Sequence, residues 1–160
     1  MNHITHITKL ILAAAIALAI TSTCHAQNKE KKITSHDLPA AVQKTVDEQA
    51  KGATIRGFST EMEKGKRLYE AQLTVSGHSK DISMDANGNI VEIEEEVAID
   101  GLPKNVKENL TKAAGAGTIT KVESITKNGK LVAYEAAVKN GPKHSEIQVG
   151  PAGNKLAHPE

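Results

Sequence analysis

The sequence predicts an α+β protein of two tandem units, each a helix followed by four antiparallel strands, which together form one continuous curved sheet with the helices on one face. The first observation behind this prediction is an internal repeat. Leu-Pro-x-x-Val beginning at Leu38 returns at Leu102, and Tyr-Glu-Ala beginning at Tyr69 returns at Tyr134. The second is that each copy opens with an apolar stripe of helical period and continues with segments that alternate between apolar and polar residues.

The residues before the repeat have the pattern of a secretory signal peptide, assigned to residues 1–26. Lys9 precedes an unbroken apolar run over residues 10–20, and small residues lead to Ala26. The run is too short to cross a bilayer as a stable helix, so no stable membrane span is expected. We expect cleavage after Ala26 and a periplasmic or secreted protein. The alternative is a lipoprotein in which Cys24 becomes the lipidated first residue.

Composition and the repeat set the boundaries of the remaining segments, and composition argues against nucleic acid as a partner. Residues 27–35 are polar and charged, and are expected to be a flexible lead-in. The two repeats are assigned to residues 36–98 and 99–160. The chain has a net charge of only +1, two tyrosines, one phenylalanine and no tryptophan. Nucleic-acid binding is therefore not expected, because it usually requires a basic stripe and stacking aromatic side chains.

Each repeat begins with a predicted helix of about three turns. Leu38, Val42 and Val46 recur every fourth residue and form one apolar stripe. Asp37 can accept hydrogen bonds from the free amides of the first turn, and Pro39 lies near the first helical position, where its missing amide costs nothing. The second repeat has the same stripe at Leu102, Val106 and Leu110.

Four strands are predicted after the first helix, at residues 54–62, 67–75, 80–84 and 89–97. Asn87-Gly88 and Asn128-Gly129 are typical of two-residue hairpins, because such turns need positive φ angles. The second repeat follows the same scheme, but its final strand stops almost at once in the sequence KLAHPE. Incomplete pairing of that last strand is therefore an open alternative.

Alternation along the strands assigns side chains to the two faces of the sheet. Tyr69 and Tyr134 are predicted to face the helix-covered core. The opposite face is predicted to be polar and free to meet a partner, with these candidate binding residues: Glu70, Gln72, Glu92, Glu94, Glu135 and Lys139.

The Leu-Pro-x-x-Val helix start, the Tyr-Glu pair in the second strand and the sequence DISMDANGNIVEIEEE resemble the PepSY and PepSY-like families. The resemblance spans the chain from about Asp37 onward as two copies, and a duplicated unit of this kind is also similar to the beta-lactamase inhibitory protein fold. That resemblance implies a sheet face, turned away from the helices, that grips an enzyme. Other PepSY domains occur in propeptides that restrain secreted metallopeptidases.

Catalytic chemistry is not predicted, and neither a cofactor nor a metal site is expected. The mature histidines have no paired spacing, there is no Gly-rich phosphate loop and no nucleophile elbow. The sequence DANGN from Asp85 resembles the start of a calcium loop, but its glycine is misplaced and the closing glutamate is missing, so a hairpin is favoured. We therefore expect a non-catalytic binding protein that inhibits or holds a secreted or periplasmic enzyme such as a peptidase. The alternative is an envelope protein that binds a small ligand or calcium.

Overall fold

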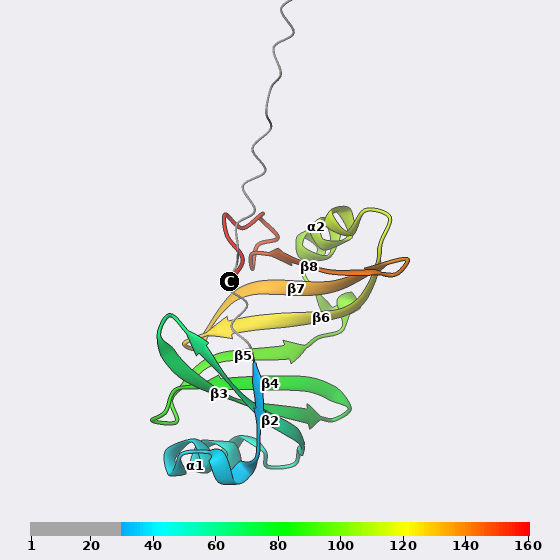
Figure 1. Cartoon of the computed structure of the whole chain (residues 1–160). Helices are drawn as coiled ribbons and strands as arrows, with labels where there is room; N and C mark the ends of the chain where they lie inside the picture. Colours follow the sequence, from blue (N-terminus) through cyan, green and yellow to red (C-terminus); the bar gives the residue numbers. More distant parts are fainter. Residues whose placement is uncertain (1–29) are drawn as a thin grey trace, which may run out of the picture.

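The computed structural model describes residues 30–160, which form one antiparallel sheet of eight strands whose spatial order follows the sequence (Figure 1). The elements of this region are β1 (Lys31–Ile33), η1 (Ser35–Asp37), α1 (Ala40–Gln49), β2 (Thr54–Glu63), β3 (Lys66–Val75), β4 (His78–Met84), β5 (Ile90–Glu96), η2 (Ile99–Gly101), α2 (Lys104–Ala114), β6 (Thr118–Lys127), β7 (Lys130–Asn140) and β8 (Lys143–Val149). The predicted α+β class and the single continuous sheet agree with this architecture. Neither α-helix in residues 30–160 is long and apolar enough to cross a membrane. The predicted signal peptide, its cleavage site and Cys24 lie outside the described residues.

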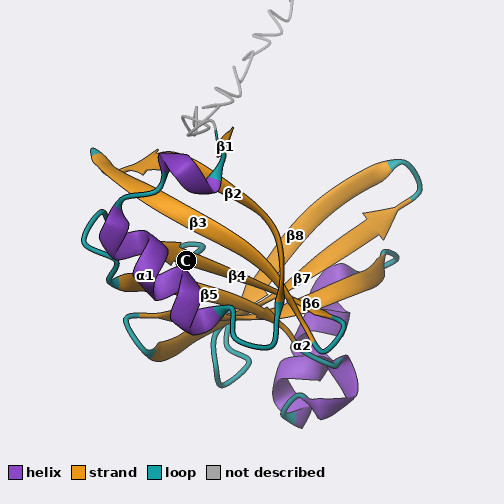
Figure 2. Cartoon of the chain, turned by 90° about the horizontal axis from the view of Figure 1, so that it is seen from below, coloured by secondary structure: helices purple, strands orange, loops and turns teal. Residues whose placement is uncertain are grey.

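The two helices lie near opposite ends of a curved sheet, yet they cover the same face of it (Figures 1 and 2). In the first half, Ala71 stands opposite Ile82, and Ile82 stands opposite Ile93. These side chains pack with Val42 and Val46 of α1, which are almost completely buried. The apolar stripe of the helix thus meets one set of alternating strand positions, and their burial stabilises the first half.

The second half repeats this packing around α2. Val106 and Leu110 of the helix are fully buried against Val122 of β6 and Ala136 of β7. The tyrosines of the repeated triplet pack in corresponding places, Tyr69 against the first core cluster and Tyr134 against the second.

The second half has three strands after its helix, where four were predicted. Beyond β8 there is a single bridge between Val149 and Lys155. The last strand of the second repeat is therefore reduced to one pair, in line with the early stop of its apolar pattern.

The turns separate into two kinds. Lys64-Gly65, Ser76-Gly77 and Asn128-Gly129 all have positive φ at both positions and close two-residue hairpins. Asn128-Gly129 thus forms the predicted hairpin. The prediction was wrong for Asn87-Gly88, because only Gly88 has a positive φ and five residues separate the paired Met84 and Ile90.

In the longer turn between β4 and β5, Gly88 is the point at which α1 docks on the sheet. The backbone of Ala41 lies so close to Gly88 that an added Cβ would be 2.8 Å from the carbonyl carbon of Ala41. Thr45 Oγ1 donates a hydrogen bond of 2.8 Å to the Gly88 carbonyl oxygen. In the second half Gly153 approaches Asn105 of α2 in the same way, with 2.7 Å between an added Cβ and the Asn105 carbonyl oxygen. The glycine of each final turn therefore lets the first turn of a helix touch the sheet.

Two local predictions near the start of the fold were wrong. Asp37 does not cap α1, because the extended Leu38 and Pro39 separate it from the helix. Its carboxylate instead accepts hydrogen bonds from the backbone amide and hydroxyl of Thr34, each at 2.8 Å, within the η1 turn. Part of the expected flexible lead-in is also a strand, since β1 pairs with residues 58–60 of β2.

Candidate partner-binding face

The face of the sheet turned away from α1 and α2, termed the open face, is lined mainly by acidic side chains. Strand register brings them together across the sheet, since Glu70 stands opposite Ser83, Ser83 opposite Glu92, and Asp81 opposite Glu94. The acidic residues of its strands are Glu61, Glu63, Glu70, Asp81, Glu92, Glu94, Glu96, Glu123, Glu135 and Glu146.

The open face carries two neighbouring hollows. The first, of about 400 Å³, is lined among others by Glu70, Glu92 and Glu94, and the second, of about 710 Å³, by Glu94, Glu135, Glu146 and Gln148. Both hollows also share Pro159 and Glu160. The residues after β8 therefore run onto the open face and lie between the two hollows.

One hydrogen-bonded chain ties these last residues to the sheet. The backbone amide of Glu160 donates to Gln148 Oε1 at 2.8 Å, and Gln148 Nε2 donates to Glu135 Oε2 at 2.7 Å. The expectation of a wholly free open face was therefore wrong at this point, because the chain itself covers part of the second hollow.

Several open-face carboxyl groups are held in a partly dehydrated environment. Burial, followed by the negative charge of Glu92, raises the pKa of Glu94 to about 8. Burial is also the largest cause that raises the pKa of Glu70, Asp81 and Glu135 above the ordinary range. Removing a carboxylate from water disfavours its charged form, and neighbouring carboxylates add repulsion. The open face thus gathers acidic groups at a cost in free energy.

Basic side chains compensate only part of this charge. Lys127 Nζ lies 3.4 Å from Glu92 Oε2, and an Arg56 guanidinium nitrogen lies 2.5 Å from Asp81 Oδ1. Neither pair involves Glu70, Glu94 or Glu135. In these described residues the carboxylates of the open face therefore outnumber the cations that contact them.

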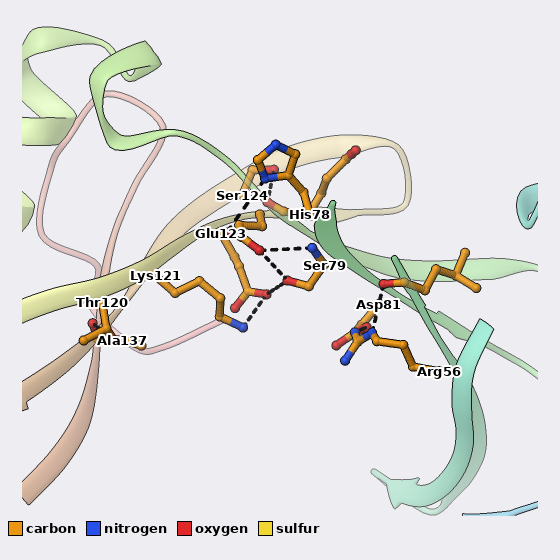
Figure 3. Close-up of polar contacts among 12 residues, drawn as sticks. Arg56, His78, Ser79, Asp81, Thr120, Lys121, Glu123, Ser124 and Ala137 are labelled. Atoms are coloured by element: carbon orange, nitrogen blue, oxygen red, sulfur yellow. Dashed lines mark hydrogen bonds and ion pairs between the residues drawn. The ribbon is translucent and has the colours of Figure 1, made fainter. Parts of the chain in front are cut away.

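A polar network joins the two halves on the open face, where β4 begins and β5 ends (Figure 3). The backbone amide and hydroxyl of Ser79 donate to Glu96 Oε2 at 3.0 and 3.2 Å, and Ser79 Oγ lies 3.3 Å from Glu123 Oε1. Glu123 is only 6% exposed and pairs with Lys121 Nζ at 2.8 Å. Because β4, β5 and β6 contribute to it, the network links the two halves, and Lys121 compensates one of its two carboxylates.

The family assignment comes from comparison with known proteins. A family model described as "Putative beta-lactamase-inhibitor-like, PepSY-like" matches residues 24–92 and again residues 67–156. The chain belongs to this PepSY-like family. No curated protein matches it.

Solved structures share the fold of this PepSY-like chain at low sequence identity. A "putative periplasmic" protein of Bacteroides eggerthii superposes with a TM-score of 0.60 at 16% identity, covering 74% of this chain and 86% of the other. A DUF2874 family protein of Bacteroides ovatus superposes with a TM-score of 0.57 at 18% identity, covering 74% of this chain and 84% of the other. A BLIP-like protein of Bacteroides fragilis superposes with a TM-score of 0.53 at 24% identity, covering 72% of this chain and 81% of the other.

In this PepSY-like protein, the six predicted binding residues do not form one group. Glu70, Glu92 and Glu94 line the first hollow, and Glu94 and Glu135 line the second. Gln72 donates a hydrogen bond of 2.8 Å to Glu70 Oε1. Lys139 is exposed at the far end of β7, opposite Thr118 and His144, and lines neither hollow.

Sequence reasoning missed Asp81, Glu123 and the last residues of the chain. Glu123 alternates with the core-facing Val122 and Ser124, and this alternation is the signal that could have placed it on the open face. Nothing comparable marks Pro159 and Glu160, since their position depends on the path of the chain after β8.

The acidic residues do not converge as metal ligands. Over residues 30–160, no three or more His, Cys, Asp or Glu side chains are placed so as to hold a metal ion. The Asp85 carboxylate accepts hydrogen bonds from the backbone amides of Asn87 and Asn89, at 2.8 and 3.0 Å. The DANGN sequence therefore forms a closed turn between β4 and β5.

Ser59 provides a stability prediction for the open face. It stands opposite Glu70, is 2% exposed, and its hydroxyl has no hydrogen-bond partner among the described residues. A buried hydroxyl without a partner destabilises the folded state, so Ser59→Ala is expected to raise the free energy of unfolding by about 1 kcal/mol. Urea denaturation measures this change. A loss of stability in Ser59→Ala would show that the hydroxyl has a partner, for instance a buried water.

Proposed function

We propose that this PepSY-like protein is a non-catalytic periplasmic binding protein that holds a partner protein, such as a secreted enzyme, through its open face. The observation that carries the proposal is the acidic open face itself. Both helices cover the other side, and the open face presents hollows lined by Glu70, Glu94 and Glu135, three carboxylates that form no ion pair with a lysine or arginine among residues 30–160. A partner that supplies lysine or arginine side chains would complement this charge.

Binding of such a partner would relieve the electrostatic strain of the open face. A cation placed near Glu94 favours its ionised form, and so lowers a pKa that burial and Glu92 have raised. Association would therefore release protons and strengthen with rising pH around neutrality. It would also weaken with added salt, because screening reduces attraction between exposed charges.

A periplasmic location is supported by two independent observations. Residues 1–26 have the pattern of a signal peptide. The structural neighbour from Bacteroides eggerthii is described as a "putative periplasmic" protein. The description of the family as beta-lactamase-inhibitor-like supports inhibition as one form that the binding could take.

A charge-reversal experiment tests the open face. The full chain would first capture periplasmic and secreted proteins of the producing organism, and the identified partner would then be titrated by calorimetry. The double variant Glu70→Lys with Glu135→Lys is expected to weaken this affinity at least about 10-fold, because it places cations where the partner presents its own.

The matched control changes the net charge of the protein by the same amount, but on the side that carries the helices. Glu48 of α1 and Glu108 of α2 are both exposed and face away from the sheet. The variant Glu48→Lys with Glu108→Lys should bind the partner as the unmodified protein does. Equal affinity of both double variants would refute the open face as the binding surface.

A further inference from the structure

The residues that follow β8 are the second half's counterpart of β5, but they leave the edge of the sheet. The bridge between Val149 and Lys155 takes the place of the pair that begins the β4–β5 ladder. By the repeat spacing, residues 156–160 then correspond to residues 91–95 of β5. They do not continue along β8, and they turn onto the open face instead. We term residues 156–160 the strap.

The turn that precedes the strap is anchored to the rest of the fold. The Gly150 amide donates a hydrogen bond of 2.8 Å to the Asn154 carbonyl oxygen, and the Gly153 amide donates one of 2.8 Å to the Gly150 carbonyl oxygen. Asn105 Nδ2 of α2 donates to the Ala152 carbonyl oxygen. The strap therefore starts from a fixed point between α2 and β8.

The strap itself is held only lightly. Leu156 is half-buried, and the other four residues are exposed. Within residues 30–160, the strap makes one hydrogen bond, from the Glu160 amide to Gln148 Oε1 at 2.8 Å. Glu160 lines both acidic hollows and forms no ion pair within this range, so its negative charge opposes closure. A segment held in this way can be displaced without unfolding the sheet.

The strap lies where a basic partner would bind. Four of its five residues line the second hollow, and two of these, Pro159 and Glu160, also line the first. Between them lies Glu94, which lines both hollows. A partner segment that reaches Glu94 and Glu135 together would have to pass through the space that the strap occupies.

The residue that holds the strap also contacts a carboxylate of the second hollow. Gln148 accepts the hydrogen bond from the Glu160 amide, and its Nε2 donates to Glu135 Oε2 at 2.7 Å. A lysine or arginine of a partner that pairs with Glu135 competes with Gln148 for this carboxylate. Loss of that bond frees the Gln148 side chain to rotate, and its hold on the Glu160 amide weakens. Pairing at Glu135 thus favours release of the strap.

We propose that the strap is an autoinhibitory segment, which covers the open face between the two hollows in the free protein and is displaced by a cationic segment of the partner. The inference rests on the proposed function, because it concerns the same face. The apparent affinity for the partner equals the intrinsic affinity multiplied by the fraction of molecules in which the strap is open. Loosening the strap should therefore tighten binding.

The test uses acetyl-pentalysine amide as a defined cationic probe, titrated into the full chain at low ionic strength and followed by NMR shifts of the Glu94 and Glu135 amides. Glu160→Pro removes the N–H group that donates to Gln148, whereas Glu160→Gln retains it, and both variants remove the same charge. Glu160→Pro is expected to bind the probe about 5-fold more tightly than Glu160→Gln, the effect of one hydrogen bond. Heteronuclear NOE values at residues 156–158 should fall in the free Glu160→Pro variant, because the strap becomes mobile.

A second variant changes the affinity in the opposite direction. Ala157 is exposed and lines the second hollow with Glu94 and Glu146. Ala157→Lys should hold the strap against these carboxylates and weaken probe binding several-fold. Thr111→Lys adds the same charge on α2, outside both hollows, and should weaken it less.

The outcomes separate the strap from the proposed function. Equal affinity of Glu160→Pro and Glu160→Gln for the probe would overturn the strap proposal and leave the open face as a binding surface. Unchanged NOE values in Glu160→Pro would also overturn it, because Gln148 would then not hold the strap. Tighter probe binding by Glu160→Pro would support the strap even if the charge-reversed variants Glu70→Lys with Glu135→Lys and Glu48→Lys with Glu108→Lys bound the captured partner equally. That last result would refute the proposed function alone.

Discussion

Gly88→Ala is expected to destabilise the protein by roughly 3–5 kcal/mol, a large share of the stability of a small domain. The added Cβ would overlap the backbone of Ala41 and approach Thr45 Oγ1 at 2.9 Å. Backbone atoms of a docked helix cannot rotate away as a flexible side chain can, so α1 must shift from the sheet. The φ of 77° at Gly88 adds conformational strain for alanine. Urea denaturation at neutral pH measures the loss.

Gly65→Ala separates the two contributions to this loss, which are the overlap with the helix backbone and the strain of a positive φ. Gly65 has nearly the same backbone conformation, with a φ of 79°, but an added Cβ there would meet nothing within 4 Å. Its substitution should therefore cost only about 1 kcal/mol, the strain of a positive φ. Equal losses for Gly88→Ala and Gly65→Ala would contradict the assignment of Gly88 as the helix docking point.

The parts of the fold that could be predicted from the sequence are those that a local periodicity of apolar and polar residues specifies. The stripe of Leu38, Val42 and Val46 indicates a helix because its spacing is helical, and strand alternation assigns neighbouring residues to opposite faces. Gly88 and Gly153 also match in the repeat, and the structure gives the physical reason, because each lies at a turn where the backbone of a helix approaches closely. Glu70, Glu94 and Glu135 could be placed on the face away from the helices for the same reason.

The features that sequence did not predict depend on contacts between distant segments. β1 is a polar three-residue strand, Lys31–Ile33, with no alternation to mark it, and its pairing depends on the free edge of β2. The hydrogen bond between Ser79 and Glu123 joins residues of different repeats, and no local pattern specifies it. Likewise, the passage of Glu160 over Gln148 depends on where the chain turns after Lys155.

Raising the pH from about 5 to about 9 is expected to lower the stability of the unmodified protein, and Glu94→Gln is expected to remove much of this loss. The pKa of Glu94 is about 8 in the folded state against an ordinary value of 4.5, because burial and the charge of Glu92 disfavour its ionised form. Between these values the folded state retains a proton that the unfolded state has lost, so the free energy of unfolding falls as pH rises. Above pH 8 the charged Glu94 should cost roughly 1–3 kcal/mol, allowing for partial solvent screening.

Glutamine imitates the protonated carboxyl group, and this makes the pH dependence of the variant informative about the open face. Glu94→Gln should match the unmodified protein near pH 5 and exceed its stability near pH 9, as measured by urea denaturation across that range. The control Glu48→Gln removes an exposed carboxylate of α1 and should leave the pH profile unchanged. If the profile of Glu94→Gln instead ran parallel to that of the unmodified protein, Glu94 would be ionised at neutral pH in the folded state. The open face would then hold its charge without strain, and a basic partner would gain no proton-linked affinity from it.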